Sequence, residues 1–236
     1  LLTFGGEYRK EDYESTRIKG SNRTTLEGVT TQLGDSSMDF AALYLQDEWV
    51  VNPRWLIIPS LRWDYNSEFG NELTGKLGTT YKITKDVRFK ANVGTAYRAP
   101  TSSELYMDWD GMPSGMPFKL WIHGNPNLKP ETALNFDLGF ELEKDKTFGK
   151  ITYFHNKVDD LITSIPKREF GPPPVWHQYY INKKKATLQG VEFEARQMLG
   201  NGFSLRGLYT YLDARDGDGI RLLARPDHTV SLQLSY

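Results

Sequence analysis

The chain contains 236 residues, with 29 Lys and Arg against 30 Asp and Glu and no Cys, and its mean hydropathy is −0.55. The near-zero charge argues against a nucleic-acid-binding protein, because such proteins carry a basic excess. The absence of Cys excludes disulfide scaffolds and thiol nucleophiles. The longest apolar run, from Phe40 to Leu45, is far shorter than the roughly 20 residues of a transmembrane helix. Because the chain starts at Leu1 without a signal sequence, we expect a processed product or a fragment.

Apolar and polar residues alternate along most of the chain with the period of two that is typical of strands. Between Trp55 and Tyr65, for example, Trp55, Ile57 and Trp63 share one face of the strand, whereas Arg62 and Asp64 share the other. The pattern predicts about ten strands, at residues 2–12, 38–50, 55–65, 72–82, 87–97, 131–143, 150–158, 179–197, 203–212 and 228–236.

Short and long connections between these strands alternate along the chain. We expect short turns at residues 51–54, 83–86, 144–149 and 199–202, and long loops at 13–37, 97–130, 159–178 and 213–227, with a shorter case of the second kind at 66–71. In an antiparallel up-and-down meander this order places every tight turn at one end and every long loop at the other, as in membrane-spanning β-barrels. A soluble sandwich also shows alternating strands, but it gives no reason for loop length to alternate.

Aromatic residues collect near the ends of the predicted strands, on or beside their apolar faces. A membrane-spanning barrel carries such aromatic girdles where its wall meets the two membrane surfaces. The residues are Trp49, Trp55, Trp63, Tyr65, Tyr81, Tyr97, Tyr209 and Tyr211.

The polar faces carry many long charged side chains. A barrel of about eight strands has an interior that side chains just fill, so these charges would have to pair closely in a small barrel. A wider barrel would give them water or a polar plug, and a closed ten-stranded barrel with a paired interior stays open as an alternative. The charged residues are Arg62, Asp64, Lys76, Lys82, Arg88, Lys90, Asp137, Glu141, Glu192, Glu194, Arg196 and Arg206.

Two short boxes bracket the most distinctive segment. The first box is Tyr97-Arg98-Ala99-Pro100 and the second is Asn125-Pro126-Asn127-Leu128, which continues to Glu131. Together with Tyr44–Trp49, the strand start at Asn182–Glu192 and Arg225-Pro226, they resemble the TonB-dependent outer-membrane receptors of haem, siderophores and cobalamin.

The resemblance implies an all-β antiparallel transmembrane barrel of 22 strands around an N-terminal plug. Residues 1–236 would form part of the C-terminal barrel domain, without the plug or the remaining strands. The intact protein would lie in the bacterial outer membrane, in contact with lipopolysaccharide. It would bind a small-molecule metal chelate at its extracellular loops and would import it through a TonB complex that contacts missing N-terminal regions. The resemblance implies no intrinsic cofactor and no enzyme activity.

The boxes also have a purely structural interpretation. Pro100 lacks an N–H donor and disfavours helical geometry at Ala99, so it ends the first strand ladder. Asn125 and Pro126 favour an Asx turn before the next strand. Both interpretations, shaping of strand ends and direct ligand contact, stay open at this point.

Between the boxes lie His123, Tyr106, Trp109 and Trp121, which are the candidate ligand-binding residues. Haem receptors of this family carry a His between the boxes, and His123 matches by placement. It would be a metal ligand only if the cargo is haem, because neutral imidazole binds haem iron. Asp108-Trp109 has a counterpart in some receptors for catecholate siderophores, and cobalamin is a third candidate. His155 and His177 have no partner at metal-ligand spacing in the sequence.

Other classes of function are weaker. The run Asp216–Gly219 lacks the later ligands of a calcium-binding EF-hand loop and is expected to be a polar turn. Lys183–Lys185 could reach lipopolysaccharide phosphates or could be a solvated run. No catalytic constellation is recognised. A passive porin and a soluble β-rich carbohydrate-binding or adhesion module are the alternatives from other classes.

Overall fold

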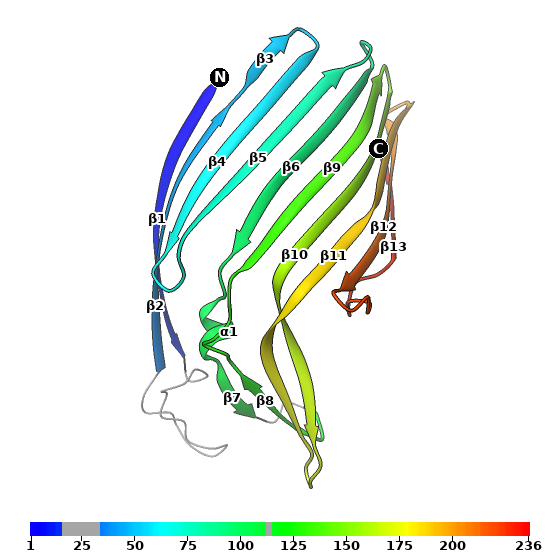
Figure 1. The fold of residues 1–236 in the computed structure, drawn as a ribbon. Helices are drawn as coiled ribbons and strands as arrows, with labels where there is room; N and C mark the ends of the chain where they lie inside the picture. Colours follow the sequence, from blue (N-terminus) through cyan, green and yellow to red (C-terminus); the bar gives the residue numbers. More distant parts are fainter. Residues whose placement is uncertain (16–33, 112–114) are drawn as a thin grey trace.

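The computed structural model describes residues 1–15, 34–111 and 115–236. Ten of its strands follow one another in chain order across a single sheet, and every neighbouring pair is antiparallel (Figure 1). They are β1 (Leu2–Ser15), β2 (Gly34–Asp47), β4 (Trp55–Asn66), β5 (Gly70–Lys82), β6 (Val87–Arg98), β9 (Glu131–Lys144), β10 (Thr147–Glu169), β11 (Val175–Gly200), β12 (Phe203–Asp216) and β13 (His228–Ser235). Among the described residues, no helix is long and apolar enough to cross a membrane.

The predicted all-β, up-and-down meander is confirmed. Each of the ten predicted strands corresponds to one strand of the sheet, and the sheet is curved and open, with β1 and β13 at its two edges (Figure 1). Short turns join the strands at one end, at the top of Figure 1, and the long connections lie at the other end together with the short turn between β4 and β5. The central part of the predicted loop 13–37 lies outside the described residues.

Three boundary predictions need correction. The predicted strand 38–50 is interrupted at Glu48, after which β3 (Trp49–Asn52) forms a tight hairpin with β4. The predicted loop 97–130 contains α1 (Ser102–Tyr106), β7 (Asp108–Gly111) and β8 (Lys119–His123).

The third correction concerns residues 159–178, which are mostly not a loop. Strands β10 and β11 continue past the sheet as a paired hairpin as far as Glu169 and Val175. Pro166 argues against a strand in the sequence, because proline cannot donate a ladder hydrogen bond. The hairpin tolerates it because β10 pairs with β9 only as far as Asp159, which leaves the outer side of β10 unpaired here.

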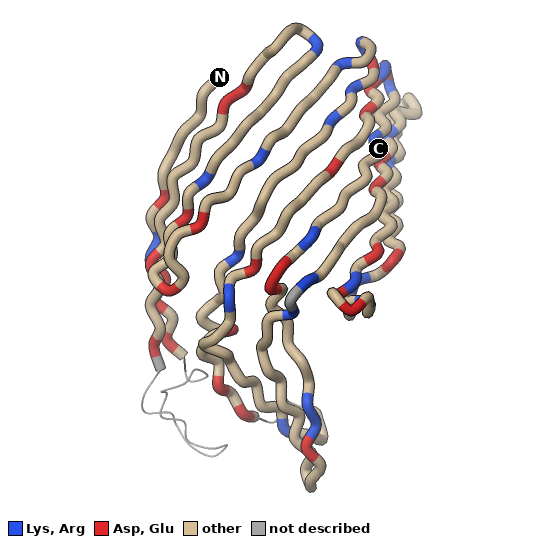
Figure 2. Tube along the Cα trace, in the orientation of Figure 1, with Lys and Arg blue, Asp and Glu red and all other residues tan. Residues whose placement is uncertain are grey.

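The register places all twelve predicted inward charges on one face of the sheet. Several of these residues form cross-strand ion pairs on that face (Figure 2 shows the charges along the strands). Glu141 is 2.5 Å from Arg88 and 2.7 Å from Lys90, and Arg206 is 2.8 Å from Glu194.

The opposite face is apolar and exposed. Its side chains include Leu61, Leu73, Phe136, Phe140 and Ile151, each of which is more than one third exposed. A soluble monomer rarely leaves an apolar surface of this extent in water, whereas the hydrocarbon of a bilayer covers it favourably.

The fully buried apolar side chains gather at the long-loop end. Met38, Leu105, Leu128 and Ile162 form one cluster, against which Phe40, Phe69, Tyr106 and Tyr180 pack. Leu105 belongs to α1 and Leu128 to the second sequence box, so this cluster fastens the segment between the boxes to the wall. The site described next rests on it.

Candidate functional site

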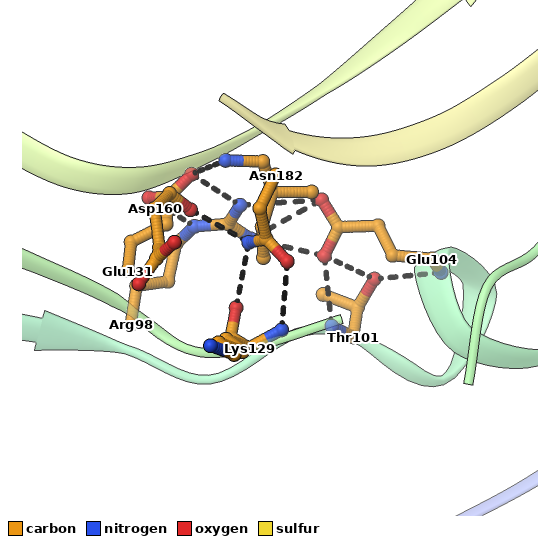
Figure 3. Close-up of polar contacts among 8 residues, drawn as sticks. Arg98, Thr101, Glu104, Lys129, Glu131, Asp160 and Asn182 are labelled. Carbon is orange, nitrogen blue, oxygen red and sulfur yellow. Dashed lines mark hydrogen bonds and ion pairs between the residues drawn. The ribbon is translucent and has the colours of Figure 1, made fainter. Parts of the chain in front are cut away.

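The two sequence boxes meet at Arg98, the last residue of β6. Its guanidinium donates to Glu131, the first residue of β9, through Nε and Nη2 at 2.8 and 2.9 Å. Through Nη1 it also donates to Glu104 Oε2 in α1, at 3.0 Å (Figure 3). The planar, five-donor geometry of arginine suits such bidentate contact with two carboxylates. Arg98 therefore ties both strand ends and α1 together.

Helix α1 is held by a capping box. The Thr101 hydroxyl accepts from the Glu104 main-chain N–H at 3.3 Å, and the Glu104 carboxylate accepts from the Thr101 N–H at 2.8 Å. Burial alone would raise the pKa of Glu104, but the hydrogen bonds from Arg98 and Thr101 outweigh it and leave this pKa below its ordinary value. Glu104 thus stays ionised between Arg98 and the helix start.

The second box is a turn fastened to the neighbouring hairpin. Asn125 Oδ1 accepts from the Asn127 N–H at 3.0 Å, which is the expected Asx turn, and Asn125 Nδ2 donates to the Tyr180 carbonyl at 3.0 Å. Asn182 exchanges two hydrogen bonds with the Lys129 main chain, at 2.8 and 2.9 Å, and donates a third to the Asp160 carbonyl at 2.7 Å (Figure 3). These contacts give both boxes a structural role at the strand ends.

Gly124 lies between β8 and this turn at a close approach of two main chains. A Cβ added at Gly124 would lie 2.6 Å from the Met107 nitrogen and 2.7 Å from the Leu105 carbonyl oxygen. Since these neighbours are backbone atoms, only glycine lets the chain pass here. The close approach of the main chain at the end of α1 therefore requires glycine at position 124.

A cluster of aromatic and imidazole rings lies beyond the wall, where β8 pairs with β11. The parallel register places Trp121 opposite His177 and His123 opposite Tyr179. The His123 ring stacks on Tyr179 at 4.5 Å and 9°, and the Trp121 ring is 4.8 Å from that of His123. We call Trp121, His123, His177 and Tyr179 the ring cluster. Such a surface suits a flat or aromatic partner.

Hydrogen bonds fix the imidazoles within the ring cluster. His123 Nε2 is 3.0 Å from His177 Nδ1, and His177 Nε2 is 3.1 Å from Glu169 Oε2. When His177 Nε2–H donates to Glu169, His177 Nδ1 accepts from His123 Nε2–H. The lone pair of a neutral His123 then lies on His123 Nδ1. Burial and the adjacent His177 lower the pKa of His123. Among the described residues, no group of three or more His, Asp or Glu side chains is placed to hold a metal ion.

The structure brings together only part of the predicted site. Trp121 and His123 share the ring cluster, and the Trp121 indole donates to Asp108 at 2.9 Å. Trp109 lies opposite Ile122 in the β7–β8 ladder and therefore on the other face from Trp121. Tyr106 packs against the buried cluster and donates to Glu68 at 3.4 Å.

His177 and Tyr179 complete the ring cluster and Glu169 contacts it through His177, and sequence reasoning did not place these three residues there. They fall in or beside the segment predicted as a loop, and their partner β8 is 54 residues away from His177. The alternation of Val175, His177 and Tyr179 with Trp176 and Gln178 was the available signal for a strand.

Comparison with known proteins gives a consistent picture. The family described as TonB dependent receptor-like, beta-barrel, matches residues 1–236. The vitamin B12 transporter BtuB of Photobacterium profundum is 30% identical over 220 residues, which cover 91% of this chain and 33% of that protein. The ferric enterobactin receptor of Pseudomonas aeruginosa is 26% identical over 261 residues, which cover 100% of this chain and 34% of that protein.

Solved structures share the fold. The ferric enterobactin receptor PfeA of Pseudomonas aeruginosa has a TM-score of 0.74 at 24% identity, with 99% of this chain and 36% of that chain covered. The copper transporter OprC has a TM-score of 0.75, at 17% identity, with 99% and 38% covered. The chain thus spans about one third of the length of the curated relatives that it matches.

Replacing Arg98 by Met should loosen α1. The Glu104 and Glu131 carboxylates would lose their shared cation, and hydrogen bonds to charged groups contribute about 1.5–3 kcal/mol each. Because Arg98 is 42% exposed, solvent screening reduces this, and we expect about ten-fold faster amide exchange over residues 101–107. Arg98→Lys should recover part of the protection. Arg88→Met, which removes the Glu141 pair elsewhere in the wall, is the control, and equal exchange in all three variants would contradict the role of Arg98.

Acid should weaken the contact between β8 and β11. Because the pKa of His123 is depressed in the folded state, the opened state binds more protons, so the stability of the closed pairing falls as pH drops through the ordinary histidine range. Amide exchange of residues 119–123, corrected for its intrinsic pH dependence, should accelerate as the pH is lowered from neutral through this range. His123→Gln should flatten this dependence and His155→Gln should not. An unchanged slope in His123→Gln would refute this assignment.

Proposed function

This chain belongs to the TonB-dependent receptor family, and on that premise we propose that the intact protein imports a metal chelate across the outer membrane with energy supplied through TonB. Residues 1–236 supply part of the C-terminal barrel domain, and the plug and TonB-contacting segment belong to the remainder. The relatives that this chain matches are named as receptors and transporters. Contact with lipopolysaccharide at the outer rim is part of the proposal. Lys183 contributes little to it, because its ammonium pairs with Asp216 at 2.5 Å.

The cargo that the ring cluster favours is a ferric siderophore with aromatic iron-binding groups. This preference rests on one observation. The ring centres of Trp121 and His123 are 4.8 Å apart and those of His123 and Tyr179 are 4.5 Å apart, where β8 pairs with the part of β11 that continues past the sheet. Rings of a catecholate could stack against such a surface. The relatives named as ferric enterobactin receptors support the same class.

The hairpin tip carries two exposed cations, Lys167 and Arg168, against one anion, Glu169, and this net positive charge supports an anionic cargo. The Arg168 guanidinium lies 4.8 Å from the Phe170 ring centre and 5.6 Å from that of Trp176, and Lys167 next to it is exposed. Catecholate oxygens around Fe³⁺ leave the complex anionic, so these cations would steer it toward the β10–β11 hairpin that continues past the sheet. Stacking and charge therefore favour the same ligand class.

Haem is the second candidate, and His123 is the observation that favours it. Its Nδ1 is the nitrogen left free by the contact with His177, so a bound haem would have to approach that atom or displace His177 from Nε2. Cobalamin is the third candidate, supported by the name of the vitamin B12 transporter that this chain resembles.

Fluorescence titration of the intact receptor tests the assignment. We expect ferric enterobactin, used as the probe, to quench tryptophan emission and Trp121→Leu to weaken binding about ten-fold, as loss of a central aromatic contact commonly does. Trp109→Leu is the matched control, because Trp109 lies on the opposite face of the β7–β8 ladder.

Two further probes separate the candidates. A Soret shift of haemin that His123→Ala abolishes would replace the siderophore with haem. Saturable binding of cyanocobalamin alone would replace both with cobalamin. Equal affinity of wild type, Trp121→Leu and Trp109→Leu for ferric enterobactin would overturn the role of the ring cluster.

A further inference from the structure

An open apolar groove of about 540 Å³ lies on the outward face of the sheet near the short turns. Trp55, Tyr81, Phe89 and Phe140 form a row of direct cross-strand neighbours over β4, β5, β6 and β9. The next row contains the small residues Thr79 and Ala91, which also pair with each other. The groove lies where the large rings of the first row stand beside the small side chains of the second row. Ile83 lines the groove at the end nearest the turn.

The Trp55 indole and the Thr79 hydroxyl, two polar groups of this groove, are hydrogen-bonded within the protein. The Trp55 indole N–H donates to the Thr79 hydroxyl at 2.9 Å, and that hydroxyl donates to the Leu56 carbonyl at 3.2 Å. The groove therefore presents carbon to its surroundings, and Trp55, Tyr81 and Phe140 are 39%, 42% and 47% exposed. Its volume falls within the range of about 300–1,000 Å³ that is usual for ligand sites. A hydrocarbon chain fits this chemistry.

Two cations lie beside the groove, in the two turns that border it. Arg54 directly precedes Trp55, and Lys85 follows Ile83 by two residues. The Lys82 N–H donates to the Arg54 carbonyl at 2.8 Å, which ties the ends of the two hairpins together. Both side chains are exposed, and neither has an ion-pair partner among residues 1–15, 34–111 and 115–236. Basic residues at the short-turn end are visible in Figure 2.

We propose that this groove binds one phospholipid of the periplasmic leaflet, with an acyl chain against the aromatic row and an anionic headgroup near Arg54 and Lys85. The short turns of such barrels face the periplasm, which places the groove in that leaflet. Asp86, in the same turn as Lys85, is the nearest acidic residue in the sequence, and it leaves the two turns with a net positive charge. The occupant is therefore an anionic lipid rather than a zwitterionic one.

Native mass spectrometry of the intact receptor in detergent, titrated with phosphatidylglycerol or phosphatidylethanolamine, tests the proposal. Each cation near a lipid phosphate contributes about 1 kcal/mol, so Arg54→Gln/Lys85→Gln should bind phosphatidylglycerol about 30-fold more weakly. Phosphatidylethanolamine binding should change little. The control is Lys167→Gln/Arg225→Gln, which removes the same charge from exposed residues at the opposite end of the sheet.

A second variant tests the acyl-chain seat. Ala91→Phe places a ring in the second row, directly opposite Thr79, where it narrows the groove, and it should reduce binding of both lipids. Heat-modifiable migration on gels would verify that each variant is folded. Unchanged phosphatidylglycerol affinity in either groove variant, an equal loss in the control, or displacement of the lipid by inorganic phosphate would overturn the proposal.

Discussion

The alternation of side chains along each strand determines the character of both faces of the sheet. In hydrocarbon every main-chain N–H and C=O group needs an internal partner, and an antiparallel sheet supplies these partners from strand to strand. Because successive side chains point to opposite faces, the same strands present Phe136 and Phe140 outward and Asp137 and Glu141 inward. A negative mean hydropathy is therefore compatible with a membrane wall, since half of each strand is polar.

The sheet alone does not create the candidate site, because most charged side chains on its inner face form ion pairs with one another. The site arises where the ladder ends. Pro100 stops β6, Arg98 joins Glu104 and Glu131, and the buried Leu105 and Leu128 fasten the intervening segment. This frame positions β8 beside the extended β10–β11 hairpin and so assembles the ring cluster. Under the proposed function, the two boxes would act on the ligand through this placement.

Local periodicity made the wall predictable, whereas long-range pairing did not. The ten strands, their faces and the Asx turn at Asn125 follow from neighbours in the sequence. The hairpin beyond Asp159 was missed because Pro166 argues against a strand, and the parallel pairing of His123 with Tyr179 has no signal in residue spacing. For the same reason Trp109 was grouped with Trp121, although one residue of register places them on opposite faces.

Each strand of the sheet has one lipid-facing and one lumen-facing side, and spin-label accessibility along β6 measures this difference between the two sides. Because this chain has no Cys, single cysteines at residues 89–94 can carry a nitroxide in an intact receptor free of other cysteines. Labels at Phe89, Ala91 and Val93 should collide preferentially with oxygen dissolved in the bilayer, and labels at Lys90, Asn92 and Gly94 should not. Uniform oxygen accessibility along these six positions would show that the two sides of β6 do not differ in their contact with lipid.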